Sequence, residues 1–303
     1  MEIDRKELKR QARERMVLTD PKFWVVALAY IVMTTGVSWL FSLIPTPDVG
    51  ASPVDTFQLF FQLLLILYTA VVQFGLCLWA LWAYRQLDPG INSLMQGFSV
   101  AGRVLLMRLG IYARILGWYF LVSMGLSFPV VALLMRAEYA GAVTGFLLYW
   151  AALVVVLIVL ELRYALAPYL LADRPDDGPT APILRSAALM RGWKWELFKL
   201  EFSFIGWEIL NFIFSAAVVL FFLSQAGLLA SPNLADPNQL FQWTQECAAI
   251  AYSTPVVILS TLVTVPVSLW LIPYRATARA GFYDARMLAA SRGGQNYPEM
   301  PPL

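Results

Sequence analysis

Six stretches without a single charged residue constrain this 303-residue chain more than any other feature. Each is at least 21 residues long. About 20 apolar residues in a helix cross the hydrocarbon core of a bilayer, whereas a buried helix of a soluble domain needs only about 10–14. A large soluble helical domain therefore explains the pattern poorly. The six stretches are 23–47, 56–84, 115–135, 139–160, 209–235 and 247–274.

We predict an all-α polytopic membrane protein, a bundle of six transmembrane helices with cytoplasmic amphipathic helices beside it. The first stretch is too long for the apolar region of a signal peptide, so we expect an uncleaved first span. The spans fall in a domain of residues 23–287, between a basic amphipathic helix at 1–22 and a flexible tail at 288–303. The expected spans are about 23–44, 56–84, 115–135, 139–160, 203–228 and 247–274.

The lysines and arginines predict the orientation of these spans. With six spans, 21 of the 22 basic residues fall on one side of the membrane and only Arg136 falls on the other. The positive-inside rule assigns the basic side to the cytoplasm. We therefore expect a multi-pass protein of the cell membrane with both termini in the cytoplasm.

The residue types that are missing exclude several classes of chemistry. The chain has no histidine and only two cysteines, Cys77 and Cys247. Without histidine there is no Ser-His-Asp triad and no HExxH zinc site, and the chain has no Walker A or GxGxxG nucleotide motif. We expect no metal, no cofactor, no nucleic-acid partner and no enzymatic activity. An enzyme that uses only Asp and Glu stays open, although no paired-acid motif supports it.

Three segments on the basic side are candidates for amphipathic helices. Trp193 and Trp195, at the end of the last one, suit the level of the lipid headgroups. We expect these helices to lie on the inner leaflet, where basic residues attract anionic lipids. A partner-binding or gating role is the alternative. The segments are 2–18, 91–108 and 181–195.

Two segments on the opposite side carry helix-start signals. Residues 52–55 resemble a capping box with proline at the first helical position, and Asp236-Pro237 repeats the signal before the sixth span. We expect the loop at 229–247 to hold only a short helical turn.

A polar stripe leads into the fifth span. Glu201 and Glu208 lie seven residues apart, which is close to two turns of a helix. Lys194 and Ser215 extend the same spacing in both directions. On one continuous helix these residues share a face, and that face has to meet protein or water and not lipid.

The ends of the other spans place arginines at the same level. We expect the carboxylates to pair with these guanidinium groups, and Arg163 or Arg275 to face Glu208. The pairs either lock the inner ends of the bundle together or line a cytoplasm-facing polar cavity for an ion, a proton or a lipid headgroup. The candidate cluster consists of Arg114, Glu161, Arg163, Glu201, Glu208, Arg275 and Arg279.

The sixth span contains three prolines, Pro255, Pro266 and Pro273. Proline removes a backbone hydrogen bond and interrupts a helix. Broken helices surround the sites of many transporters, but they also occur as plain kinks in packed bundles. The kink is the simpler interpretation.

Seven short segments spread along the chain carry distinctive sequence motifs. They are residues 5–9, 163–169, 172–175, 186–192, 197–200, 203–207 and 273–283. They resemble those of the bacterial membrane-protein family catalogued as domain of unknown function 975. The resemblance covers almost the whole chain and is most specific over 163–207 and 273–283. It implies an integral membrane protein of mainly Gram-positive bacteria, and it implies no activity.

Membrane domains related to that family accompany glycerophosphodiester phosphodiesterases, so the resemblance points to lipid or envelope biology. We expect a non-enzymatic membrane protein in cell-envelope or lipid homeostasis, with the bilayer and anionic inner-leaflet lipids as its partners. The alternative is a small-molecule or ion transporter or channel. A polar cavity that reaches the middle of the bilayer would favour transport, and a shallow, paired cluster would favour the structural or lipid-binding role.

Overall fold

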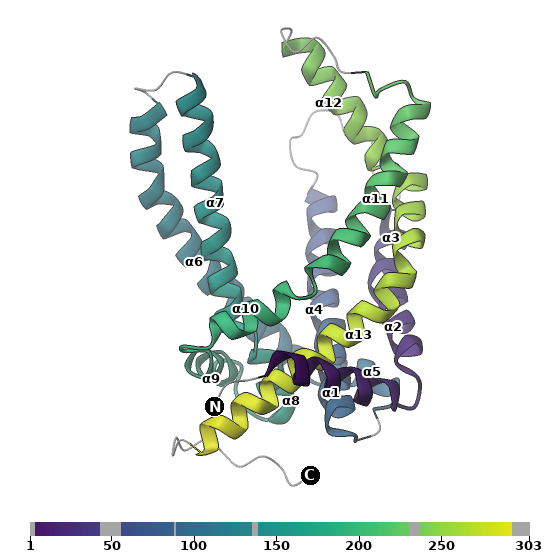
Figure 1. Ribbon diagram of the computed structural model, residues 1–303, viewed down its shortest axis with the longest axis vertical. Coiled ribbons are helices and arrows are strands. Elements are labelled where there is room, and N and C mark those ends of the chain that lie inside the picture. Colours follow the sequence, from purple (N-terminus) through teal and green to yellow (C-terminus); the bar gives the residue numbers. More distant parts are fainter. Residues whose placement is uncertain (1–3, 43–55, 88, 135–138, 231–236, 293–303) are drawn as a thin grey trace.

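The computed structural model describes residues 4–42, 56–87, 89–134, 139–230 and 237–292 (Figure 1). Every regular element in these ranges is a helix. Six helical segments are long and apolar enough to cross a membrane, which confirms the expected number of spans. They are Phe23–Leu40, Phe60–Arg85, Ala101–Phe128, Thr144–Asp173, Ile205–Gln225 and Thr254–Arg292.

Long helices stand roughly upright in Figure 1, and the first of them continues through a π-helical segment, η1. Their bounds are α2 Phe23–Ile31, η1 Val32–Gly36, α3 Val37–Ser42, α4 Thr56–Arg85, α6 Ala101–Leu134, α7 Tyr139–Tyr164, α11 Ile205–Gln225 and α13 Thr254–Arg292.

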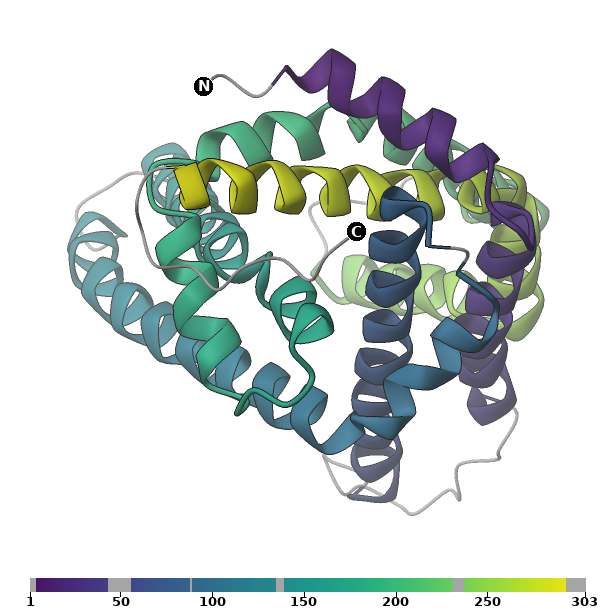
Figure 2. The ribbon, with the colours of Figure 1, turned by 90° about the horizontal axis from the view of Figure 1, so that it is seen from below.

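Five short helices gather at the lower end of the molecule, where α1 begins and α13 ends (Figures 1 and 2). Together with the part of α13 that follows Tyr274, we call them the basal layer. The five helices are α1 Arg5–Val17, α5 Asn92–Ser99, α8 Ala167–Asp173, α9 Ala181–Leu189 and α10 Lys194–Phe202.

The largest buried cluster of apolar side chains belongs to this end of the molecule. Trp79 on α4, Phe204 before α11 and Tyr283 on α13 are among its fully buried members. Helix α1 contributes Leu8 and Met16. The residues that hold the helices together therefore lie mostly around the basal layer, and the upper parts of the long helices expose apolar side chains as lipid-facing helices do.

Helix α1 shows how the sequence builds this layer. The Asp4 carboxylate accepts hydrogen bonds from the backbone N–H groups of Lys6 and Glu7, which caps the helix. Leu8, Ala12 and Met16 recur every four residues and are buried. The helix packs against α13 and α4, so its apolar face is covered by protein.

Helix α5 crosses α4 at two glycines. A Cβ atom added at Gly75 would lie 2.8 Å from the Cα of Leu94, and one added at Gly97 would lie 2.8 Å from the carbonyl oxygen of Val71. Only glycine at both positions allows the two backbones to approach this closely. The crossing fixes α5 to the part of α4 at the edge of the basal layer.

Helices α6 and α7 form a hairpin whose upper part stands apart from the other long helices (Figure 1). The hydroxyl groups of Ser123 and Tyr149 lie 2.7 Å apart and join the two helices. Outside this contact the hairpin exposes many large apolar side chains, which fit a lipid environment. They include Leu116, Phe120, Leu121, Phe128, Phe146, Leu147, Leu148 and Val155.

The upper end differs from the sequence prediction. The loop at 229–247 was expected to hold a short turn, but helix α12 runs from Pro237 to Ala251. The sixth span therefore begins at Thr254 and not at 247. Pro255 falls in the first turn, where proline is tolerated, and only Pro266 and Pro273 lie inside the helix. The predicted capping box at 52–55 lies outside the described residues.

Candidate functional site

Four of the seven predicted residues meet where α10, α11 and α13 converge. The Nε atom of Arg275 lies 2.6 Å from Glu201 Oε2, and its Nη1 lies 2.9 Å from Glu208 Oε1. Arg279 pairs with the other oxygen of Glu201. We call Glu201, Glu208, Arg275 and Arg279 the paired cluster. Arg275, one of the two expected partners of Glu208, is the one that faces it.

The predicted continuous stripe along α10 and α11 is wrong. The helix ends at Phe202, and a turn at Ser203 and Phe204 starts a separate helix at Ile205. Figure 1 shows α10 and α11 running in different directions from this turn. The two glutamates are therefore brought to one side by the turn and by α13, and not by a shared helical face.

Side chains from two other elements hold this turn in place. The ring of Phe204 packs edge-on against Tyr274, with 5.1 Å between centroids. The Nζ atom of Lys9 lies 4.5 Å from the Phe204 centroid and donates a hydrogen bond to Ser203 Oγ at 3.1 Å. Burial, and then the nearby Arg13, lower the pKa of Lys9.

Glu201 is the centre of the paired cluster. Its side chain is 14% exposed, whereas that of Glu208 is 48% exposed. Burial by itself would raise the pKa of Glu201, but the guanidinium groups of Arg279 and Arg275 outweigh it and hold the pKa below its ordinary value. The carboxylate is therefore charged at neutral pH and ties α10 to α13.

The other three predicted residues do not join this cluster. Nη1 of Arg114 donates to the Gly110 carbonyl of its own helix at 2.9 Å. The Arg163 guanidinium lies 5.7 Å from the ring centroid of Tyr164. Glu161 is exposed. Within the described ranges none of the three forms an ion pair, so the expected pairing of Glu161 is not seen there.

A second charged network, absent from the prediction, lies deeper in the basal layer. The Arg85 guanidinium bridges Asp173 on α8 at 2.6 Å and Asp284 on α13 at 2.7 Å. The hydroxyl of Tyr283 donates to Asp173 at 2.6 Å. The Arg85 side chain is only 9% exposed. We call these four residues the buried network.

The sequence does carry a signal for the buried network. Arg85 ends a long charge-free stretch, and Asp284 follows the apolar run Ala280–Tyr283. A charge at the end of such a run needs a partner if packing of the helices buries it. What the sequence lacks is the contact between α4, α8 and α13 that supplies the partners.

Trp193 also differs from its expected place at the headgroup level. Its ring lies 4.2 Å from the guanidinium carbon of Arg286, and it packs against the large buried cluster. Arg286 in turn donates to the Leu189 carbonyl at 3.0 Å. Trp195 remains exposed. Only the second of the two tryptophans is therefore free to meet lipid.

Another arginine on α6, Arg108, has a different environment. Its Nη2 atom donates to Gln73 Oε1 on α4 at 2.9 Å, while its Nε atom is buried without a hydrogen-bond partner among the described residues. The side-chain oxygens of Asn211 on α11 and Ser260 on α13 are also buried, and the described part of the chain offers them no hydrogen-bond partner. Such groups are costly in an apolar environment and mark places where a further partner would be favourable.

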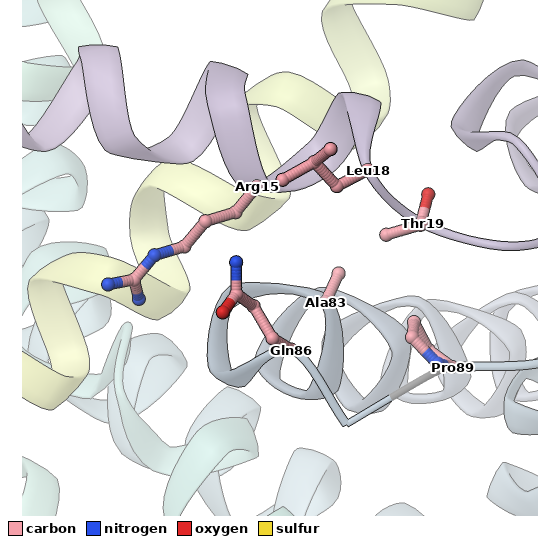
Figure 3. A pocket seen from close by; sticks show the side chains of 6 residues that line it. All are labelled: Arg15, Leu18, Thr19, Ala83, Gln86 and Pro89. Atoms are coloured by element: carbon pink, nitrogen blue, oxygen red, sulfur yellow. The ribbon is translucent and has the colours of Figure 1, made fainter.

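A small cavity opens between the C-terminal ends of α1 and α4 (Figure 3). Its volume is about 200 Å³, less than the roughly 300–1,000 Å³ of most ligand pockets. Arg15 and Gln86 are on its wall, but the Arg15 guanidinium points away and donates to the Tyr84 carbonyl at 2.6 Å. The cavity suits water better than a metabolite.

The residues of the described ranges offer no cluster of three or more His, Cys, Asp or Glu side chains that could hold a metal ion. In comparisons with known proteins, the family described as "Protein of unknown function (DUF975)" matches residues 1–289. No curated protein and no solved structure matches the chain.

Proposed function

The chain belongs to the DUF975 family, and from this premise and the placement of its charges we propose a non-enzymatic integral membrane protein that binds anionic lipid headgroups. The binding level is the boundary between the spanning helices and the basal layer. The biological setting is cell-envelope or lipid homeostasis, with the basal layer in the cytoplasm.

The observation that carries this proposal is a set of arginines without carboxylate partners. Helices α6 and α7 together contain four arginines and one glutamate. Arg103 pairs with Asp176, but Arg108, Arg114 and Arg163 form no ion pair among the described residues. A guanidinium group binds phosphate oxygens in a fork, and anionic lipid is concentrated at the inner surface of the membrane.

Thermal unfolding in an uncharged detergent tests the proposal. Phosphatidylglycerol should raise the Tm by about 5 °C at a hundredfold excess over its Kd, whereas phosphatidylcholine with the same acyl chains should have little effect. Added salt should reduce the difference because it screens exposed charges. Equal effects of the two lipids would overturn the proposal.

The orientation needs its own test. In a Cys77→Ala/Cys247→Ser background, a cysteine at the exposed Leu229 should react with an impermeant maleimide in intact cells. The matched control is Ser291→Cys near the end of α13, which should react only after the membrane is permeabilised. The reverse pattern would place the basal layer outside the cell.

A second candidate is a small-molecule or ion transporter, favoured by the unpartnered Asn211 and Ser260 oxygens on two spanning helices. Proteoliposomes loaded with a pH-sensitive dye test protons as the substrate. If Glu208 is part of the path, Glu208→Gln should abolish proton flux without changing the Tm. Absence of flux from the wild type would exclude proton transport, and a lower Tm with unchanged flux would assign Glu208 a structural role.

A further inference from the structure

Arg108 is the most confined of the three arginines on α6 and α7 that lack a carboxylate partner among the described residues. Its Nη2 atom meets an amide oxygen of Gln73, its Nε atom is buried and unpartnered, and no ion pair within the described part of the chain involves it. Among the described residues, the positive charge of Arg108 therefore has no carboxylate at ion-pair distance.

The level of Arg108 follows from the crossing of α5 and α4. Gln73 lies between Val71 and Gly75, two of the α4 residues that α5 touches. The guanidinium group of Arg108 is thus placed where α4 leaves the basal layer. Helix α5 exposes Met95 and Phe98, so apolar side chains surround this level as they do at a membrane boundary.

Apolar side chains continue upward from this level on both helices. Nearby on α6, Leu109, Tyr112 and Leu116 are exposed. On α4, Leu63 and Ile66 are exposed. A ligand at Arg108 would therefore find one cation, the amide of Gln73 and a long apolar surface beside them. This combination suits a phosphate group that carries acyl chains better than an anion from water.

We propose that Arg108 and Gln73 form a binding site for the phosphodiester group of an anionic phospholipid, whose acyl chains lie along the exposed apolar side chains of α4 and α6. The guanidinium N–H groups donate to the phosphate oxygens. Gln73 orients the guanidinium. This inference rests on the proposed function and assigns it to one pair of residues.

Two substitutions should abolish the site, one by removing its cation and the other by giving that cation an internal carboxylate partner. Arg108→Gln removes the cation, and we expect it to weaken phosphatidylglycerol binding about tenfold or more, as loss of a charge-assisted hydrogen-bonded pair does. Gln73→Glu keeps the shape but supplies an internal carboxylate 2.9 Å from Arg108 in place of the amide oxygen. It should abolish the lipid preference and raise the Tm of the lipid-free protein.

Matched controls separate these effects from a general change in charge. Arg185→Gln removes a basal arginine that is already paired with Asp177. Gln96→Glu adds a carboxylate to the exposed side of α5. Both should leave the affinity for phosphatidylglycerol within about twofold of the wild type, because Arg185 already has a carboxylate partner and a charge at the exposed Gln96 acts weakly.

Native mass spectrometry and Tm titrations of the full-length protein read out each variant with phosphatidylglycerol, phosphatidylcholine and inorganic phosphate. If Arg108→Gln and Gln73→Glu keep the wild-type preference for phosphatidylglycerol, this site is wrong while the proposed function stands. If the wild type has no preference, both fail. If inorganic phosphate matches the effect of the lipid, a soluble anion and not a lipid occupies the site. Should Arg108→Gln not fold, Gln73→Glu decides alone.

Discussion

Arginine side chains on the two sides of the basal layer have different neighbours. Around α13, Arg275 and Arg279 face the carboxylate of Glu201, and Arg85 faces two aspartates. At the base of the α6–α7 hairpin, Arg108 faces an amide, Arg114 a backbone carbonyl and Arg163 an aromatic ring. These six arginines therefore have two kinds of neighbour. Those that face carboxylates join helices, and in our proposal those at the hairpin that face neutral groups bind an anionic lipid. Arg286, which joins α13 to Trp193 and to the Leu189 carbonyl, shows that an arginine can also hold helices together through neutral groups.

The burial of side chains also differs between the α13 side and the α6–α7 hairpin. The paired cluster and the buried network lie against the largest buried cluster of the protein, and Tyr283 belongs to both the network and that cluster. The upper part of the hairpin is mostly exposed and stands apart (Figure 1). Substitutions should therefore affect folding on the α13 side and lipid binding on the hairpin side.

The largest loss of stability should come from Arg85→Met. The substitution leaves Asp173 and Asp284 buried without their cation, and breaking such a pair costs about 3–5 kcal/mol. Thermal or chemical unfolding in detergent measures the change. The control is Arg103→Met, since Arg103 and its partner Asp176 are both well exposed, and it should cost less than about 1 kcal/mol. Similar losses in the two variants would remove the distinction between buried and exposed pairs.

Gly75→Ala should come next, because its methyl group would meet the backbone of α5. The added Cβ lies 2.8 Å from the Cα of Leu94, and overpacking of this kind costs about 1–3 kcal/mol. Gly102 on α6 has open space around it, so Gly102→Ala should be neutral or stabilising by up to about 1 kcal/mol. Because α5 crosses α4 beside Gln73, Gly75→Ala should also weaken phosphatidylglycerol binding.

Most of the fold could be predicted because its signals are local. Charge-free length indicates the number of spans, and the four-residue spacing of Leu8, Ala12 and Met16 indicates a helix with one apolar face. The break at Ser203 and Phe204 could not be predicted, since the residues on both sides of it favour a helix. It depends on contacts with Lys9 and Tyr274, which come from distant parts of the chain.

The candidate site could be predicted only for ion pairs in which one residue is unusual at its position in the sequence. Glu201 and Glu208 stand out because carboxylates are rare beside a span, and the sequence limits their partners to a few arginines. Arg85 and Asp173 end their helices and Asp284 lies within α13, and nothing in the sequence indicates that the three meet. Arg108 is similar, because the sequence shows a cation but cannot show that its neighbours are neutral.

Glu201→Gln should have a moderate effect that depends on pH. Its partners are about one-third exposed, so the loss at neutral pH should be about 1–2 kcal/mol. The folded pKa of Glu201 lies below its ordinary value, so its contribution is complete above the unfolded pKa and is lost as the pH falls through the folded pKa. The wild type and the variant should differ constantly down to about pH 5 and converge below it. A difference that grows in acid would contradict the paired cluster.

The smallest effect on folding should come from Arg163→Gln on the hairpin side. Arg163 lies beside a ring and has no carboxylate partner in the described ranges, so its loss should change stability by no more than about 0.5 kcal/mol in an uncharged detergent. The affinity for phosphatidylglycerol should fall less than in Arg108→Gln, because the Arg163 side chain has no Gln73 to orient it. Arg163→Lys keeps the charge and should behave like the wild type in both measurements. A loss as large as that of Glu201→Gln would mean that arginines on both sides of the basal layer hold helices together, and the division between joining and binding arginines would fail.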